Sequence, residues 1–128
     1  MKANFKIILL FAVVISACQK INKNDGRLSE APWEEVSGFL IFGNEVSDFI
    51  ECKDTSLTFW VNDETGEMDS LYKVYSGKEY EPVYVQMEAL KLPPDPLGYA
   101  SERDGLIRVR KIFKMEKENA VNKCLSDR

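Results

Sequence analysis

Residues 56–75 read SLTFWVNDETGEMDSLYKVY and contain two hydrophobic periods. Up to Val61 the residues alternate between two sides, with Leu57, Phe59 and Val61 on one side and Ser56, Thr58 and Trp60 on the other. This is the pattern of a half-buried strand. From Met68 onward the apolar residues recur at intervals of three and four, which predicts one face of an amphipathic helix. The sequence therefore predicts a strand at 56–61 followed by a helix at 64–75.

Polar residues at both ends support this helix. Asn62 or Asp63 can cap its start, because short polar side chains accept the backbone N–H groups that lack a partner inside the helix. Glu64 and Glu67 fall in the expected first turn, where acidic groups favour the positive end of the helix dipole. Gly77 follows the last turn as an end signal.

The same acidic stretch has an alternative interpretation as a calcium loop. Asp63, Thr65, Glu67 and Asp69 alternate as early calcium ligands do. Gly66, however, stands two residues before the position at which such a loop needs its glycine. We therefore favour capping and predict no metal site.

Strands are expected on both sides of this unit. Residues 36–42 (VSGFLIF) form a β-branched and aromatic run that ends at the turn signal Gly43-Asn44, and residues 47–52 (SDFIEC) form a short second strand. Residues 82–92 alternate with one apolar side. The prolines at 93, 94 and 96 then end this strand, because proline lacks the donor that a sheet requires, and a loop runs to Gly105.

The last predicted strand, residues 106–115 (LIRVRKIFKM), alternates less regularly. Ile107, Val109 and Phe113 are expected to point inward. Lys111 and Ile112 break the pattern, as they would at a β-bulge.

The order strand, strand, strand, helix, strand, strand predicts a mainly β fold, a small five-stranded OB-like barrel with one helix between strands 3 and 4. The alternative is a small α+β sheet. At 128 residues, the chain is long enough for one such domain and too short for two.

The N-terminus predicts export. Lys2 and Lys6 precede nine consecutive apolar residues at 7–15 (IILLFAVVI), followed by Ser16 and Ala17, which is the pattern of a signal peptide. A spanning helix needs roughly 20 apolar residues, so this run is too short to remain in a membrane. We expect residues 1–17 to be removed.

Residues 15–18 (ISAC) resemble the lipobox of bacterial lipoproteins. The resemblance implies that Cys18 carries lipid, of the palmitate kind, and anchors the mature chain. Gln19 in place of an aspartate favours the outer membrane. The alternative is a plain secretory signal with an incidental cysteine. Residues 18–32 are polar and predict a flexible tether, which leaves residues 33–128 for the barrel.

Two cysteines remain once Cys18 is acylated. Cys52 and Cys124 would then be an even pair in an oxidising compartment, with one intramolecular connectivity available. We predict a structural disulfide. A redox pair or a thiolate metal site is disfavoured, because neither cysteine lies in a C-x-x-C motif and no histidine is present to complete a zinc shell.

Composition excludes several function classes. The absence of histidine excludes Ser-His-Asp and Cys-His catalysis. The formal net charge of -4 argues against nucleic acid as a partner. Carboxylates such as Glu81 and Glu88 are not paired in sequence, so we predict neither an enzyme nor a cofactor.

One strand carries a candidate partner-binding surface. Its four positive charges would suit an acidic envelope protein or an anionic glycan, and the alternative is a solvated strand face. These residues are Arg108, Arg110, Lys111 and Lys114. A second set of residues, Trp60, Tyr80, Tyr84 and Tyr99, could form an exposed aromatic patch, but aromatic residues of a small barrel are more often in the core.

The region from Val36 to Cys124 resembles the C-terminal domain of the NlpE-like outer-membrane lipoproteins, a small OB-like barrel. The resemblance rests on a spaced pattern of Gly38, Phe49, Cys52, Phe59, Val61, Leu71, Tyr75, Pro82, Val83 and Cys124. It implies this fold, a disulfide of the Cys52 to Cys124 type and a role in protein interaction, envelope stress or surface sensing. The chain lacks the family's additional N-terminal barrel with its C-x-x-C motif, so signalling tied to that domain is not carried over. The alternative function is inhibition of a periplasmic or host hydrolase such as lysozyme.

Overall fold

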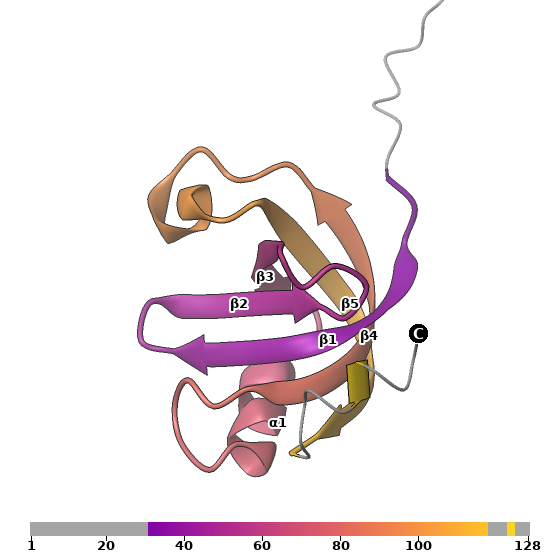
Figure 1. Ribbon diagram of the computed structural model, residues 1–128, viewed down its shortest axis with the longest axis vertical. Helices are drawn as coiled ribbons and strands as arrows, with labels where there is room; N and C mark the ends of the chain where they lie inside the picture. Colours follow the sequence, from indigo (N-terminus) through magenta and orange to yellow (C-terminus); the bar gives the residue numbers. More distant parts are fainter. Residues whose placement is uncertain (1–30, 118–122, 125–128) are drawn as a thin grey trace, which may run out of the picture. The chain divides into compact units, whose positions relative to one another are not determined.

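Five strands close into a barrel in the order β1-β2-β3-β5-β4 (Figure 1). The computed structural model describes residues 31–117 and 123–124. It confirms the predicted mainly β fold with an α-helix between the third and fourth strands. The predicted signal peptide, Cys18 and nearly all of the predicted tether lie outside the described residues. The elements are β1 Glu34–Gly43, β2 Val46–Glu51, β3 Thr58–Asp63, α1 Met68–Tyr75, β4 Val83–Leu92, the 3-10 helix η2 Gly98–Glu102 and β5 Gly105–Glu116.

The barrel is antiparallel except at one seam. β1 pairs with β2 on one side and with β4 on the other, and β4 pairs with β5, all antiparallel. β3 and β5 pair in parallel, from Phe59 opposite Gly105 to Asp63 opposite Val109. This parallel seam closes the sheet and rules out the open α+β alternative.

The helix begins later than predicted, at Met68 in place of residue 64. The Glu64 N–H donates to the Val109 carbonyl at 2.8 Å, which continues the β3–β5 pairing by one residue. Asp63 then turns the chain, because its carboxylate accepts the N–H groups of Thr65 at 2.9 Å and Met68 at 3.0 Å. The predicted cap at Asn62 or Asp63 is therefore wrong in position: the cap residue is Glu67, without a side-chain capping hydrogen bond, and Asp63 reaches the first helical N–H from five residues away. Glu64 and Glu67 precede the helix.

β5 contains the predicted β-bulge, but at the two positions that flank Lys111 and Ile112. Its register against β4 shifts twice, and these shifts leave Arg110 and Phe113 without an opposite residue. A residue added to one strand in this way forms a bulge and changes the direction of the side chains around it. The expectation that Phe113 points inward is therefore wrong, since its side chain is 45% exposed.

The core lies inside the barrel and is closed at one end by α1. All five strands contribute buried side chains to one cluster, which also includes Met68 and Tyr72 of the helix. The Tyr72 hydroxyl donates to the Glu81 carbonyl at 2.7 Å, so this buried phenol keeps a hydrogen bond. Burial raises the pKa of Tyr72 despite that hydrogen bond.

Charged groups at the other end of β4 link three strands. Glu51 of β2 is buried, and its carboxylate lies 2.7 Å from the Lys91 ammonium of β4. Lys91 also lies 3.0 Å from Glu34 of β1. Desolvation opposes the charge on Lys91, but hydrogen bonds to Glu51 and Glu34 outweigh it and raise the lysine pKa. The buried carboxylate is therefore paired, as burial of a charge requires.

Gly38 allows β1 to pass close to β2. A Cβ atom at this position would lie 2.1 Å from the Ile50 carbonyl oxygen and 2.8 Å from the Phe49 ring. The backbone oxygen belongs to the neighbouring strand of the sheet, so it cannot move aside without distorting the pairing. This close approach explains a glycine in an otherwise β-branched and aromatic run.

We predict that Gly38→Ala destabilises the barrel by about 1–3 kcal/mol, the usual cost of forcing extra volume into a packed site. Denaturant unfolding followed by tryptophan fluorescence measures the loss. Gly77→Ala is the matched control, because the atoms nearest to its Cβ would be the ends of two flexible side chains, Glu81 at 2.9 Å and Lys117 at 3.4 Å. Equal losses for the two variants would contradict this role of Gly38.

Candidate functional site

The disulfide joins Cys52, just after β2, to Cys124 near the C-terminus, as predicted. The two Cα atoms lie 4.9 Å apart and 72 positions apart in sequence. On the chain-entropy model, closing a loop of this length stabilises the fold by roughly 4 kcal/mol. The bridge is therefore suited to a structural role.

The disulfide is packed on the outer wall of the barrel. Both cysteines are buried in a small cluster with Tyr84, against which Phe39 also packs. Tyr84 alternates with the core residues of β4 and so points away from the barrel interior. The bridge thus holds Cys124 against an aromatic residue on the outer face of the barrel.

The four positive charges predicted for β5 lie on its outer side, and Arg110, Lys111 and Lys114 are exposed. Most of these positive side chains pair with an acidic side chain of the same domain. Arg108 donates to Glu64 at 2.6 Å, and Lys114 pairs with Glu116 at 2.5 Å. The Lys111 ammonium lies 5.1 Å from the centre of the Phe113 ring.

Arg110 is held more tightly than the other three. It makes two hydrogen bonds to Glu88, at 2.7 and 2.9 Å, and its guanidinium lies 4.3 Å from the centre of the Trp33 ring. Its hydrogen bonds lower the pKa of Glu88. A stacked and bidentate arginine gives rigidity and leaves little unbalanced charge for a partner. This arrangement favours the interpretation of the stripe as a solvated, internally paired face.

The four aromatic residues expected in the core divide into two groups. Tyr84 is buried and Trp60 partly buried. Tyr80 and Tyr99 are 49% and 51% exposed, so the expectation of burial is wrong for both. The alternation that places strand residues inside or outside the barrel gives no information on these two, because Tyr80 lies between α1 and β4 and Tyr99 lies in η2.

Both exposed tyrosines contact the β1–β2 turn. Tyr80 donates its backbone N–H to the Phe42 carbonyl at 2.8 Å, and its hydroxyl donates to the Asn44 carbonyl at 3.2 Å. The Tyr99 hydroxyl donates to the Glu45 carboxylate, which raises the pKa of the phenol. Residues far apart in the chain thus meet at one turn.

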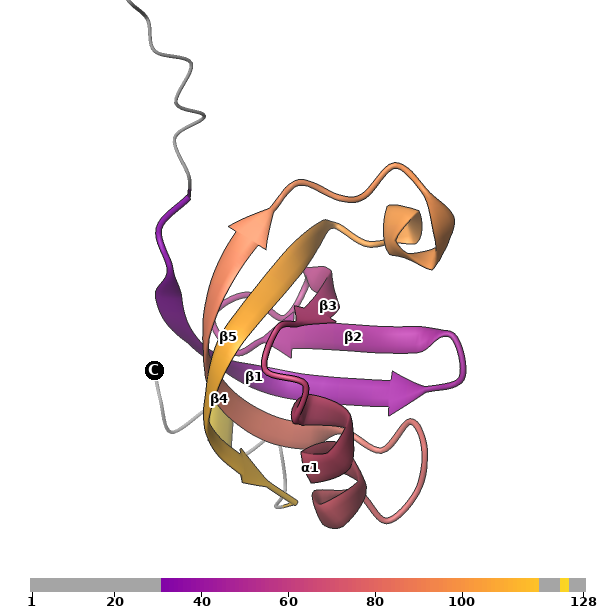
Figure 2. The same ribbon diagram turned by 180° about the vertical axis from the view of Figure 1, so that it is seen from behind.

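We call this region the loop end of the barrel. It comprises the β1–β2 turn (residues 44–45), the α1–β4 connection (76–82) and the β4–β5 connection (93–104). The three segments lie on the same side of the barrel in both views, away from the start of β1 (Figures 1 and 2). A groove of about 520 Å³ runs between the β1–β2 turn and the α1 side, and its lining includes Phe42, Asn44, Val46, Tyr72, Ser76 and Glu79.

The β4–β5 connection is fixed by polar contacts. The Arg103 guanidinium donates to Asp48 of β2 at 2.5 Å, and both side chains are largely buried, with exposures of 18% and 16%. This hydrogen bond raises the pKa of Arg103. Asp104 exchanges two hydrogen bonds with the backbone of Thr58, at 2.8 and 2.9 Å. The long loop is therefore attached to β2 and β3.

The acidic side chains of the described residues are dispersed, and the two carboxylates that the sequence offered for acid–base work make contacts within the fold. Within residues 31–117 and 123–124, no three acidic or cysteine side chains group closely enough to hold a metal ion. Glu88 is occupied by Arg110, and Glu81 accepts the Gly77 N–H at 2.5 Å. The carboxylates considered for catalysis therefore serve structural contacts.

Comparisons with known proteins returned no match: no family model, curated protein or solved structure is similar to this chain. Among the described residues, no helix combines the length and the apolar character needed to cross a membrane.

Asp48→Asn should loosen the β4–β5 connection, because it removes the charge that holds Arg103 in a largely buried position. We expect a loss of about 1–2 kcal/mol in unfolding free energy and faster amide hydrogen exchange in residues 93–104. Asp69→Asn is the matched control, since its pair with Lys73 is exposed and worth less than about 0.5 kcal/mol. Unchanged exchange in the loop of the Asp48 variant would contradict the anchoring role.

Proposed function

We propose that this chain is an exported, NlpE-like lipoprotein of the bacterial outer membrane, anchored by lipid on Cys18. Its disulfide-stapled OB-like barrel would act as a protein-interaction module, in envelope-stress or surface sensing. Its partners are the membrane, through the lipid, and an envelope protein, with an anionic glycan as the alternative ligand of the β5 stripe. The proposal includes no enzymatic activity, cofactor or nucleic acid.

The observation that carries the proposal is the Cys52 to Cys124 disulfide. Structural disulfides persist in oxidising compartments outside the cytoplasm, which fits an exported chain. The chain has three cysteines, so this pairing leaves only Cys18 as a thiol, directly after an apolar run and two small residues. A lone free thiol in an exported protein needs an explanation, and acylation supplies one.

The free energy of burying acyl chains in a bilayer supports a permanent anchor. Each buried methylene of an acyl chain contributes about 0.8 kcal/mol, so two or three chains hold a small domain on a bilayer where one chain does not. Residues 18–32 are long enough and polar enough to separate the barrel from the lipid surface. A tethered domain of this kind presents its surface to partners and has no need of a catalytic centre.

A palmitate-labelling experiment in a bacterial host tests the anchor. Cys18→Ser should abolish labelling and leave the leader of residues 1–17 uncleaved, because no other thiol is free to be acylated and a lipobox is cleaved only once its cysteine carries lipid. The matched control is the double variant Cys52→Ser, Cys124→Ser, which should keep the label. Labelling that persists in the Cys18 variant would refute lipidation at this position.

A second candidate function is inhibition of a periplasmic or host hydrolase such as lysozyme. The specific observation in its favour is the fixed β4–β5 connection, which carries Leu97 and Tyr99 exposed at its tip. A rigid exposed loop can enter an enzyme cleft with little loss of conformational entropy. We expect the purified protein to inhibit lysozyme and the Leu97→Asp variant to lose this inhibition. Full lysozyme activity in the presence of a large molar excess of the protein would exclude this candidate for that enzyme.

A further inference from the structure

The loop end exposes apolar side chains together. Leu97 is 77% exposed, Tyr99 is 51% exposed and Tyr80 is 49% exposed. A single exposed apolar residue is ordinary on a protein surface. Here, however, Tyr80 and Tyr99 contact the same β1–β2 turn, and Leu97 is two positions from Tyr99, so the three belong to one surface. Exposed apolar patches with a polar rim are typical of protein-binding sites.

This surface is held in place before any partner binds. The Asp95 carboxylate accepts the Leu97 N–H at 2.9 Å, and the Ser101 hydroxyl donates to the Gly98 carbonyl at 2.7 Å. Arg103 fastens the same segment to β2. A preformed surface loses little freedom on association, so more of the contact energy remains as affinity.

The rim of the loop end is acidic. Each of its three segments contributes an exposed carboxylate, from Glu45, Glu79 and Glu102. Two cations lie in the same region: Arg103, which pairs with Asp48 at 2.5 Å and lies 3.8 Å from Glu102, and the exposed Lys78. The three exposed glutamates still outnumber the one exposed lysine. A partner that covers this surface without leaving these carboxylates unpaired must bring positive charge to its own rim.

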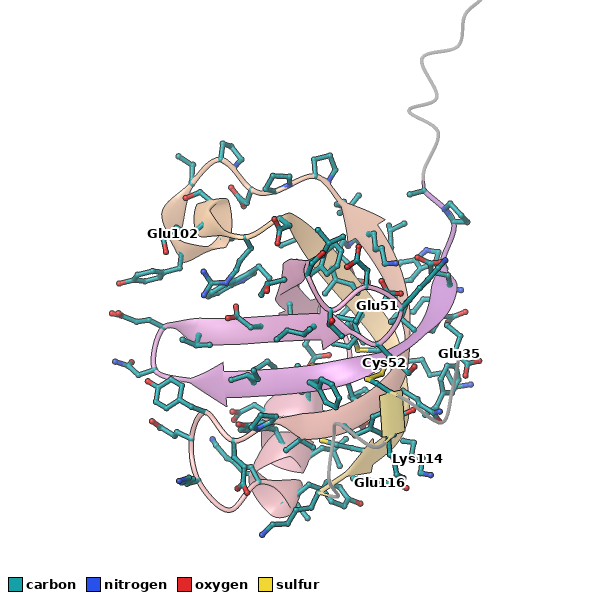
Figure 3. The ribbon with its side chains drawn as sticks, viewed as in Figure 1. Glu35, Glu51, Cys52, Glu102, Lys114 and Glu116 are labelled. Carbon is teal, nitrogen blue, oxygen red and sulfur yellow. A yellow bond between two sulfur atoms is a disulfide. The ribbon has the colours of Figure 1, made fainter. Side chains whose placement is uncertain are left out.

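The loop end also faces away from the part of the barrel where the chain enters. Figure 3 labels Glu102 of the β4–β5 connection and Glu35 near the start of β1 at opposite sides of the barrel. The same figure shows the β1–β2 turn on the side of Glu102. Within the barrel, the loop end and the start of β1 therefore lie on different sides.

We propose that the loop end is a preformed docking surface for a protein that presents an apolar pocket rimmed by lysine and arginine. The inference rests on the proposed function as an interaction module and names the surface and the class of partner. Leu97 and Tyr99 fill the pocket, and Glu45, Glu79 and Glu102 face the basic rim. An anionic membrane surface is disfavoured as the occupant, because it would repel the same carboxylates.

Photocrosslinking in intact cells of the native host tests the surface. A photoreactive amino acid is introduced into the full chain at position 97, at position 111 on the basic stripe, or at position 74. Val74 of α1 is the matched control, since its side chain is apolar and 74% exposed, close to the 77% of Leu97. We expect a specific adduct from position 97, at least five-fold stronger than from position 74, with a protein that mass spectrometry identifies as basic.

Charge reversal tests the chemistry of the rim. Glu79→Lys with Glu102→Lys should reduce the adduct from position 97 at least five-fold, because the basic rim then meets like charge. Glu35→Lys with Glu67→Lys makes the same change in net charge at exposed positions outside the loop end and should leave the adduct within two-fold. Equal effects of the two double variants would overturn the assignment.

The remaining outcomes separate this inference from the proposed function. Adducts from position 111 alone would overturn the loop end as the docking surface and leave the interaction module standing. Adducts from position 97 with lipid only, or with an acidic protein, would overturn the proposed partner class. The absence of any protein adduct from all three positions would overturn both the inference and the interaction module.

Discussion

The parallel pairing of β3 with β5 is the constraint on which the rest of the barrel depends. It joins Phe59–Asp63 to Gly105–Val109 and closes the sheet around a single core. Gly105 permits the closure, because a Cβ there would lie 2.9 Å from the Leu92 carbonyl and 3.0 Å from the Phe59 ring. The same closure brings the β4–β5 connection back across the barrel, where Arg103 meets Asp48. The loop end is therefore a consequence of how the sheet closes.

The disulfide adds a covalent link outside this barrel and connects fold with location. The bridge to Cys52 holds Cys124 beside Tyr84 of β4, so the small outer cluster depends on oxidation. On the proposed export of the chain, an oxidising compartment would maintain this bridge and so contribute to the stability of the domain.

The sequence predicted the order of elements because periods of two and of three to four residues report directly which side of a strand or helix is buried. The sequence-based prediction failed where contacts between distant residues determine the structure. The Glu64 N–H bonds to Val109 across the parallel seam, and a bulge turns Phe113 outward. The local sequence pattern shows neither feature. Tyr80 and Tyr99 lie in connections, where alternation gives no information. The proline segment and Asp95-Pro96-Leu97 were the available signal for a fixed, exposed loop.

The barrel presents two contrasting surfaces, a β5 stripe whose cations are largely paired internally and a loop end whose carboxylates surround exposed apolar residues. Both matter for function only if the chain is an oxidised lipoprotein of the envelope, which is the central claim. The most direct measurement is the intact mass of the chain purified from its native host under non-reducing conditions. The account predicts a polypeptide that begins at Cys18, carries acyl chains on that residue and is two hydrogens lighter than the fully reduced form. A mass that retains residues 1–17, or that shows an unmodified Cys18 and free thiols at 52 and 124, would contradict it.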